Sequence, residues 1–526
     1  MKKVLAAIVL FSTNTQAQWE PNGIPVCDTS ANSGFYMLPQ IASDGNGGAF
    51  VCWRDGRRGE FDIYMQRIYS NGIVQFPHNG ISLCDAPYSQ QFPRMVSNGR
   101  GGTYIAWEDD RSMTQTHVYV QRINSFGQAL WTVNGVRAAD IGGLFISLAL
   151  EPISEGVLLG WSTVADAFVQ RLDSVGNRMW GDSGVQVTNR PGNVRAGDVA
   201  VATDGNDGII VVWAEGSSGN YSVYAQRVDS RGSAQWVSNG VFLGSGGGVT
   251  ISSAGGGEVI VTWVDNLNTY IQKISVSGQA LWGTSGILVG PGGGRHAIDE
   301  LGGAFVWHGN QVQHVSASGV ALWDSTGVNY TIGPLPTSST GLGDRNSRAW
   351  IFWSALGGNA LDIFGQYIEE GGFVRWNPVG VLISSGGQLQ DFPRCAPSTY
   401  GTAILVWDDF RNGHSNVYAA IADTSGVITA IKERDDLKPN EIRLDQNFPN
   451  PFNPRTKIRY AISQANHVEL AVYDVLGRRI AILVSKHQEA GRHQVQFSGG
   501  SFPSGVYFYR LTTDQSSLVK KMILIR

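Results

Sequence analysis

Short apolar runs that begin at a glycine and end in tryptophan recur along the first 430 residues of the chain. Gly48–Trp53, Gly102–Trp107 and Gly208–Trp213 are examples, and each is apolar at successive positions. A strand that is buried on both faces has this continuous pattern. The runs end, at intervals of 44 to 54 residues, at Trp53, Trp107, Trp161, Trp213, Trp263, Trp307, Trp353 and Trp407.

Two further patterns follow these runs. An aromatic-x-Gln-Arg run comes first, as in Tyr64–Arg67 and Tyr119–Arg122, and it alternates between two faces. A glycine turn and a Trp-x-x-x-Gly-aliphatic stretch come next, as in Trp131–Val136. The first and third patterns contain 15 of the 16 tryptophans, all except Trp350. Because they recur in nearly every unit, we interpret these tryptophans as core residues between repeats rather than as a sugar-binding surface.

The repeat predicts an all-β fold, because four short β-rich runs in every 40 to 50 residues are typical of one blade of a β-propeller. The unit of Trp407 lacks its third pattern, which stands instead near the N-terminus, at Trp19–Ile24. We therefore expect an eight-bladed propeller over residues 18–428, closed by residues 18–26 pairing in the blade of Trp407. Seven blades stay open as an alternative, because the fifth and sixth units are short and the sixth is degenerate.

Composition and charge narrow the class of protein. Charged residues make up only 16% of the chain and hydrophobic ones 42%, which excludes a solvated disordered chain. The net charge is −4 and no run is rich in Lys or Arg, so nucleic acid is not an expected partner. Lys2 and Lys3, the apolar run Val4–Phe11 and a small residue at Ala17 have the form of a signal peptide over residues 1–17. We expect a secreted protein without a transmembrane segment.

The four cysteines leave their redox state open. Cys27, Cys52, Cys84 and Cys395 could form two disulfides, yet Cys52 lies in an apolar run that suits a buried free thiol. Their spacing fits no zinc site. The stretch Asp44–Gly47 hints at calcium, but a tight turn needs the same residues, so no cofactor is expected.

One face of the predicted ring is the candidate ligand face. The loops after each tryptophan run and between blades share this face and vary in length, and variable loops on a rigid scaffold often carry function. Trp-x-Asp-x-Arg occurs three times there, which singles out Asp55, Arg57, Asp109, Arg111, Asp409 and Arg411. Each Asp–Arg pair either braces its own loop or belongs to a patch that binds a polar ligand or glycan. The stretch Gly181–Gly184 resembles a serine-protease motif but occupies a repeat turn, so no catalytic residue is expected.

The repeat stops after residue 428. Residues 429–442 are charged and contain proline, as a linker does, and residues 443–526 hold six or seven short β-like runs that predict a small C-terminal β-sandwich. Four motifs stand out there: Asn447–Pro454, Val472–Arg478, Ser504–Arg510 and Lys520–Met522.

These motifs resemble the type A C-terminal sorting domain of the type IX secretion system. The motif residues are Asn447, Pro449, Asn450, Pro451, Phe452, Asn453, Pro454, Tyr473, Asp474, Gly477, Gly505, Tyr507 and Lys521. The resemblance implies export by the type IX machinery across the outer membrane of a Gram-negative, Bacteroidetes-like host. It also implies removal of the domain, followed by release or attachment to the cell surface. We expect Gly505 to occupy a turn with a positive φ.

The sequence favours a secreted or cell-surface binding propeller whose ligand, a glycan or a protein, it does not name. The alternative is an extracellular glycan-active or peptide-active hydrolase or lyase on the same ring, and a purely structural role is a third hypothesis. Two carboxylates roughly 5 to 9.5 Å apart in a deep pocket would favour a glycosidase.

Overall fold

The structure, a computed structural model, divides the chain into two compact units that meet at residue 430, and each is described by itself. It describes residues 19–29, 36–141, 143, 145–163, 166–188, 195–217, 220–323, 327–398, 401–428, 442–444, 447, 450, 452–488, 491–500, 502–514 and 516–525. The expected signal peptide and nearly all of the expected linker lie outside these residues. Every regular element within them is a β-strand.

The first unit contains eight antiparallel sheets. Blades 1 to 4 consist of β2 (Gln40–Ser43), β3 (Ala49–Asp55), β4 (Asp62–Ile68) and β5 (Ile81–Cys84); β6 (Gln90–Ser97), β7 (Thr103–Asp109), β8 (His117–Ile123) and β9 (Val136–Arg137); β10 (Phe145–Ile153), β11 (Gly156–Thr163), β12 (Ala167–Asp173) and β13 (Val185–Gln186); and β14 (Arg195–Thr203), β15 (Ile209–Ser217), β16 (Asn220–Val228) and β17 (Val241–Ser245). Blades 5 to 8 consist of β18 (Gly247–Gly255), β19 (Glu258–Asp265), β20 (Asn268–Ile274) and β21 (Ile287–Pro291); β22 (Gly294–Ile298), β23 (Ala304–His308), β24 (Gln311–Val315) and β25 (Val328–Asn329); β26 (Ser338–Asp344), β27 (Arg348–Leu356), β28 (Leu361–Ile368) and β29 (Val381–Ser384); and β30 (Gln390–Pro397), β31 (Ala403–Asp409), β32 (Asn416–Asp423), β33 (Gly426–Ile428) and β1 (Ile24–Cys27).

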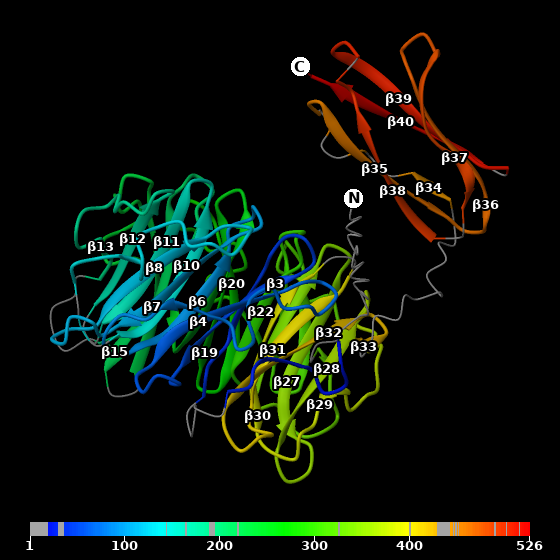
Figure 1. Cartoon of the computed structure of the whole chain (residues 1–526). Coiled ribbons are helices and arrows are strands. Elements are labelled where there is room, and N and C mark those ends of the chain that lie inside the picture. Colours follow the sequence, from blue (N-terminus) through cyan, green and yellow to red (C-terminus); the bar gives the residue numbers. More distant parts are fainter. Residues whose placement is uncertain are drawn as a thin grey trace, which may run out of the picture. The chain divides into compact units, whose positions relative to one another are not determined.

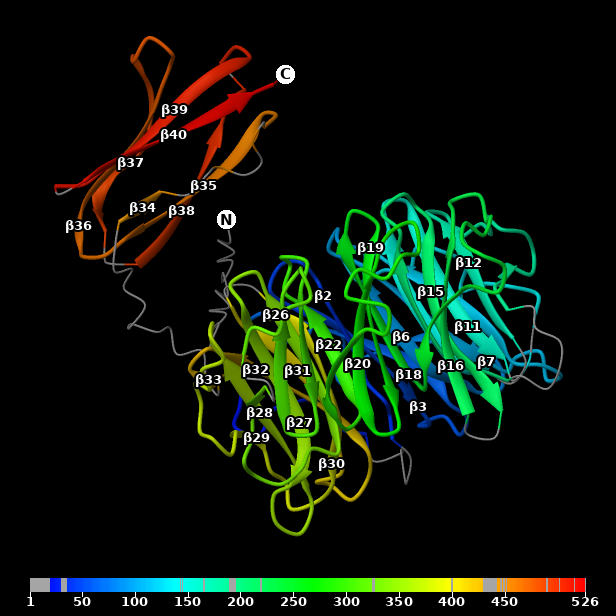
Figure 2. The ribbon, with the colours of Figure 1, turned by 180° about the vertical axis from the view of Figure 1, so that it is seen from behind.

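The eight sheets close into a ring. The first strand of each blade contacts the first strand of the next, and β2 of blade 1 contacts β30 of blade 8. In Figure 1 and Figure 2 the blue strands of blade 1 therefore lie beside the yellow strands of blade 8. The first strands line the central channel, and the prediction of an eight-bladed propeller is confirmed.

The N-terminal strand closes the ring, as the sequence predicted. β1 pairs antiparallel with β32, with Ile24 opposite Ala419. Trp19 is buried, and its Nε1 donates a hydrogen bond of 3.0 Å to the Ser70 carbonyl in blade 1. β1 therefore covers the edge of β32, which would otherwise be an exposed strand edge of blade 8.

The glutamine of the second pattern fixes the path into each outer strand. In blade 2, Gln121 Oε1 accepts hydrogen bonds of 2.9 Å from the backbone N–H groups of Arg122 and Trp131. Its Nε2 donates to the Thr132 carbonyl over 2.9 Å. The buried amide thus satisfies backbone groups of a turn that has no ladder partner for them. The same arrangement recurs at Gln66, Gln170, Gln226, Gln272 and Gln366.

The tryptophans of the third pattern tie neighbouring blades together. Trp131 of blade 2 donates from Nε1 to the Ser174 carbonyl of blade 3 over 3.1 Å. The equivalent bond recurs at Trp19, Trp180, Trp236, Trp282 and Trp376. These rings fill the gaps between blades, which confirms their interpretation as core residues.

Blade 6 departs from the repeat. The run from Gly303 to Trp307 is one residue shorter than the other examples, and a shift of one residue in a strand turns every side chain to the opposite face. Trp307 therefore packs toward blade 7, where its Nε1 donates to the Ser339 hydroxyl over 3.0 Å. His308 takes the tryptophan position instead, beside Gly290. The assignment of Trp307 to the first pattern was wrong for this reason.

The second unit is a small β-sandwich, as predicted. One sheet contains β34 (Arg443–Leu444), β35 (Arg455–Ile462) and β38 (Gly491–Ser498), and the other contains β37 (Arg479–Gln488), β36 (Asn466–Tyr473), β39 (Gly505–Thr512) and β40 (Ser517–Leu524). Ile458, Leu470, Tyr509 and Met522 are buried in its core.

Candidate functional site

Asp109 and Arg111 hold the loop after β7 in shape. Asp109 is fully buried and accepts hydrogen bonds from Trp107 Nε1 at 2.9 Å and from Arg111 Nε at 2.8 Å. The Arg111 guanidinium lies over the Tyr119 ring, 3.8 Å from its centroid, and donates to the Asn134 carbonyl over 2.8 Å. The carboxylate and the guanidinium therefore brace the start of the outer strand of their own blade.

The same brace recurs in blades 1 and 8. Arg57 pairs with buried Asp55 and stacks on Tyr64, and Arg411 pairs with buried Asp409. About a fifth of each of these arginine side chains stays exposed, so the six predicted residues present a narrow guanidinium edge on the variable face. Whether a ligand uses that edge stays a prediction.

Each brace also reaches the preceding blade. The Arg57 guanidinium contacts Cys27 Sγ at 3.2 Å, Arg111 contacts Cys84 Sγ at 3.3 Å, and Arg411 donates to Ser384 Oγ over 2.9 Å. Sequence reasoning missed these three partners, because they stand 27 to 30 residues from their arginines. Their shared position, at the end of an outer strand, is a signal that aligning the repeats could have found.

Burial and hydrogen bonds act in opposite directions on the charges of the brace. Burial would raise the pKa of Asp55, but hydrogen bonds from Arg57 and Trp53 outweigh it and hold that pKa below its ordinary value. Burial raises the pKa of the Cys27 and Cys84 thiols to about 12. All four cysteines are free thiols in the structure, so no disulfide joins them.

In the turn Asp44–Gly47, which suggested a calcium site, the Asp44 carboxylate already has protein partners. Asp44 Oδ1 accepts hydrogen bonds from the backbone N–H groups of Asn46 and Gly48, and Oδ2 pairs with Arg67 at 2.7 Å. The residues fit a braced turn rather than a cation site.

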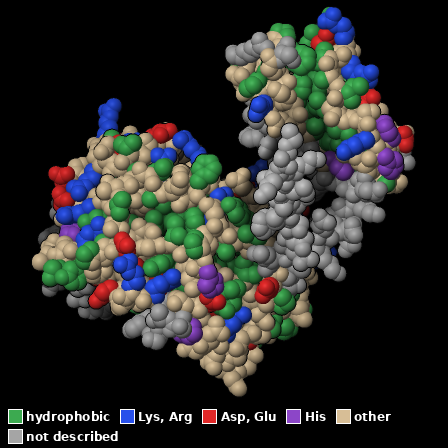
Figure 3. Space-filling model, viewed as in Figure 1, with side chains coloured by type: hydrophobic (Ala, Val, Ile, Leu, Met, Phe, Trp, Pro, Cys, Tyr) green, Lys and Arg blue, Asp and Glu red, His purple; other side chains and the backbone are tan. Residues whose placement is uncertain are grey.

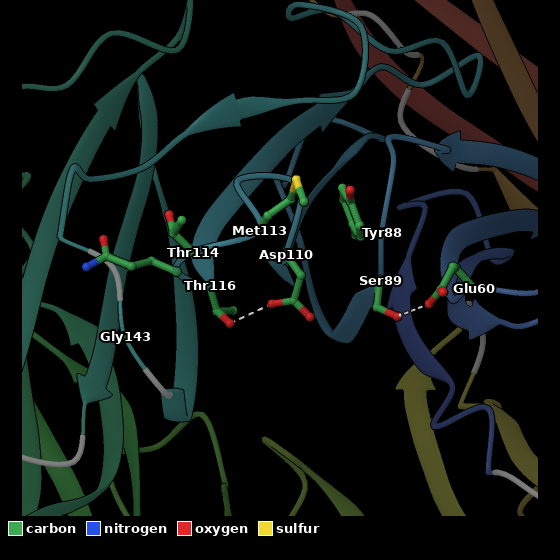
Figure 4. Close-up of a pocket in the computed structure, with 9 residues that line it drawn as sticks. Glu60, Tyr88, Ser89, Asp110, Met113, Thr114, Thr116 and Gly143 are labelled. Carbon is green, nitrogen blue, oxygen red and sulfur yellow. Dashed lines mark hydrogen bonds between the residues drawn. The ribbon is translucent and has the colours of Figure 1, made fainter.

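A hollow of about 560 Å³ lies on the variable face, next to the brace of blade 2. Glu60, Tyr88, Ser89, Asp110 and Met113 line it, together with Thr114, Gln115, Thr116 and Gly143 (Figure 4). Ser89 Oγ donates to Glu60 over 2.9 Å, and Thr116 Oγ1 donates to Asp110 over 2.5 Å. Tyr88 and Met113 are exposed, so the hollow combines an apolar rim with carboxylate and hydroxyl oxygens.

On the face of the molecule seen in Figure 3, basic and acidic side chains are interspersed. No helix in the described part of the chain is long and apolar enough to cross a membrane.

In the second unit, the motif residues tie the segment before β35 to the β39–β40 hairpin. The backbone N–H of Asn447 donates a hydrogen bond of 2.8 Å to the Tyr509 hydroxyl. Asn450 Oδ1 accepts from the Ile523 N–H over 2.8 Å, and Phe452 is buried and exchanges backbone hydrogen bonds with Ile523 and Ile525. Pro449 and Pro451 lie outside the described residues.

Two of the motif glycines differ in their backbone. Gly477 has a φ of 77° in the turn where Asp474 Oδ1 accepts the N–H groups of Leu476 and Arg478 at 2.9 Å. Gly505 begins β39 without a positive φ, and a Cβ there would meet open space. The expectation of a positive φ at Gly505 was therefore wrong, because the chain at this position is already an extended strand.

The remaining motif residues support the sheet that contains β39. The Tyr507 hydroxyl donates to the Pro503 carbonyl over 2.7 Å, and Arg510 donates to the Tyr473 hydroxyl over 2.5 Å. Asn453 and Pro454 are exposed where the chain enters β35, and Lys521 is exposed on β40.

Residues 446–525 match the family model described as the secretion system C-terminal sorting domain. The second unit is a secretion-system sorting domain. A sorting domain of this type IX kind implies secretion, or a place on the outer-membrane surface, in Bacteroidetes-type hosts. The sequence resemblance is confirmed.

No curated relative matches the chain. Solved structures that resemble it include an alpha-L-arabinanase from Penicillium chrysogenum complexed with arabinobiose, at 13% identity over 56% of this chain and 93% of that one, with a TM-score of 0.36. The Dos1 propeller is 8% identical over 77% and 96% of the two chains, with a TM-score of 0.41. An alpha-L-arabinofuranosidase from Fusarium graminearum is 13% identical over 66% and 97%, with a TM-score of 0.34. Scores this low carry no argument about what the propeller does.

Proposed function

We propose that this protein is a binding propeller that the type IX secretion machinery delivers to the cell exterior or surface, with the sorting domain as its address. The match of residues 446–525 to the sorting-domain family supports the delivery. The expected signal peptide over residues 1–17 would supply the first step, across the inner membrane.

A fusion tests the address. Residues 429–526 attached behind a foreign periplasmic protein should carry that protein out of a host with the type IX machinery. The control host lacks the machinery and should retain the fusion in the periplasm. Equal release from both hosts would show that these residues are not an export signal.

The propeller then binds its ligand on the variable face, at the hollow beside Tyr88. Three features support this surface. Tyr88 and Met113 expose an apolar rim, while Glu60, Ser89 and Asp110 offer oxygens close by, a combination that suits a sugar with its apolar ring face and hydroxyl groups. The braces of blades 1 and 2 hold the surrounding loops, so the surface is preorganised.

A glycan array with the purified full chain tests this surface. The Tyr88→Ala variant should lose at least tenfold in affinity for the glycans that the wild-type protein retains. Phe126→Ala is the matched control, because Phe126 is also an exposed aromatic residue but lies in a turn of the opposite face. Equal binding by both variants would place the ligand elsewhere.

The alternative function is hydrolysis of a glycan at the hollow, and the same purified protein can be assayed for it. Glu60 and Asp110 both line it, and each already accepts a hydroxyl donor from a neighbouring residue. Hydrolysis of a bound glycan by the wild-type protein, abolished in Glu60→Gln or Asp110→Asn, would replace binding with glycosidase activity.

A further inference from the structure

Three arginines lie on the strands that line the central channel. Arg94 is on β6 in blade 2, Arg295 is on β22 in blade 6, and Arg394 is on β30 in blade 8. The first strands of neighbouring blades contact one another round the ring, so side chains that leave them inward share one channel. Arg94 and Arg394 each end the sequence Gln-x-Phe-Pro-Arg, which Arg295 does not share.

Strand pairing places two of the arginines at the same level of the channel. Arg94 is opposite Ala106, and Arg394 is opposite Val406. Each partner stands directly before the tryptophan of its run, so the two arginines occupy equivalent positions. Residues opposite each other in an antiparallel pair point to the same face, which gives both side chains the same direction.

The shift in blade 6 brings the third arginine to this level. Arg295 is opposite Trp307, and Trp307 precedes His308, which takes the tryptophan position in this blade. The equivalent residues of the remaining blades are uncharged: Gln40, Ala149, Ala200, Thr250 and Thr340. One layer of the channel therefore carries three guanidinium groups and no carboxylate.

Most N–H donors of the three guanidinium groups have no partner among the residues that the structure describes. Arg94 donates to the carbonyls of Leu148 and Pro93 at 3.1 and 3.2 Å, and Arg394 donates to Pro393 at 3.0 Å. The guanidinium of Arg295 makes no hydrogen bond with the described residues. Within that part of the chain none of the three forms an ion pair.

The like charges act on one another. Burial and then the charges of Arg295 and Arg94 lower the pKa of Arg394 to about 10, so Arg394 stays charged at neutral pH. Burial also lowers the pKa of Arg94 and Arg295. Carboxylates of Glu108, Asp198 and Asp408 lie within electrostatic reach of one arginine each. Like charges gathered at one level of the channel repel, and this repulsion is relieved when an anion enters.

We propose that this arginine layer binds a small polyvalent oxyanion, a polycarboxylate or a phosphate, in the central channel. Guanidinium groups match the oxygens of both classes with pairs of parallel N–H donors. Groups from three blades surround the anion, so it cross-links the ring from inside. This site is separate from the hollow on the variable face, and neither needs the other.

Thermal melting and calorimetry of the full chain test the proposal, with citrate and inorganic phosphate as probes at constant ionic strength. Each probe is compared with sodium chloride. Wild-type protein should gain several degrees in Tm with at least one probe. Arg295→Gln and Arg394→Gln should each weaken its binding at least tenfold. The control Arg231→Gln changes an exposed arginine in a turn of blade 4 and should bind as wild type does. Tighter citrate binding identifies a carboxylate ligand, and tighter phosphate binding a phosphate ligand.

The apo protein gives a second readout that a structural role would not produce. Without an anion, Arg295→Gln removes repulsion and should melt at or above the wild-type temperature, which also shows that the variant folds. A lower Tm in the absence of anion would mean that Arg295 supports the fold. That result, or equal binding of both probes by Arg295→Gln and Arg231→Gln, would overturn the proposal, as would no binding of either probe at 10 mM.

Discussion

At the scale of the residue, the buried carboxylate of each brace makes several stabilising contacts, and Asp109 is the example in blade 2. It accepts from Trp107, neutralises Arg111 and shapes the loop between β7 and β8. In Asp109→Asn the guanidinium keeps its charge without a counterion. We expect a loss of about 2 to 3 kcal/mol in the free energy of unfolding, below the full range for a broken buried pair because Arg111 is partly exposed. Denaturant unfolding measures it.

The thiol of the brace offers a matched control. In Cys84→Ser the hydroxyl can still accept from Arg111, as Ser384 accepts from Arg411 in the blade 8 brace. We expect a change of less than about 1 kcal/mol. A loss as large as that of Asp109→Asn would mean that packing around residue 84, rather than the ion pair, carries the stability.

The free thiols make stability depend on alkaline pH. Burial raises the pKa of Cys27, Cys84 and Cys395 to about 12 in the folded state, whereas an unfolded thiol ionises near 8.5. Above that pH the unfolded chain releases protons that the folded chain retains, so stability falls as pH rises from about 8.5 toward 12. A thiol reagent at pH 8 should label the four cysteines only after denaturation. Rapid labelling of the native protein would contradict this.

Most of these side-chain partners could not be predicted from the sequence. The motif Trp-x-Asp-x-Arg identified the charges, but Cys27, Cys84 and Ser384 come from a neighbouring blade and differ in type. Arg94 and Arg394 share the sequence Gln-x-Phe-Pro-Arg, but Arg295 can be placed with them only by strand pairing. The missing residue before Trp307 hides that alignment in the sequence.

At the scale of the element, β1 is the part on which closure depends. Deleting residues 18–26 removes Trp19 and most of β1, which uncovers the edge of β32. Exposed strand edges pair with other chains, so we expect concentration-dependent aggregation and a lower Tm, measured by light scattering and calorimetry. Trp236→Ala, at the same repeat position inside the ring, should lower Tm without aggregation. A deletion variant that melts and dissolves like the wild-type protein would show that closure does not need β1.

Elements were largely predictable because their pattern is repeated. The Trp19–Ile24 stretch predicted β1 and its partner blade, since a missing pattern at one end and an extra one at the other can be joined only by closure. The glutamine of the second pattern was visible as a repeat, but its bonds to the next turn depend on side-chain geometry that spacing does not contain.

At the scale of the whole molecule, we expect each of the two compact units to fold and act without the other. Removing residues 443–526 takes away the sorting domain and leaves the eight blades complete. We expect the truncated protein to remain in the periplasm of a host with the type IX machinery, with a Tm within about 2 °C of that of the intact propeller. Cell fractionation and calorimetry measure both. Equal export of both proteins would contradict the address, and a large loss in Tm would contradict independent folding.

The sorting domain could be inferred from sequence because its motifs are specific, whereas the propeller repeats report packing alone. The blades need tryptophan, glutamine and glycine at fixed places to pack, and these places hold no information about a ligand. The hollow consists of loop residues, and the arginine layer consists of residues that only three of the eight blades carry. The packing pattern therefore predicted the ring but not its chemistry.

The pairing of β1 with β32 also bears on the rate at which the protein folds. Ile24 and Ala419 are separated by 395 residues, so the ends of the ring must find each other across almost the whole propeller. Contacts of such long range slow folding, because loop entropy is lost before they form. The first strand therefore stays unpaired until blade 8 has formed. We infer that closure of the ring is the last folding step. Weakening the pairing of β1 with β32 should then accelerate unfolding and leave the earlier steps of folding unchanged.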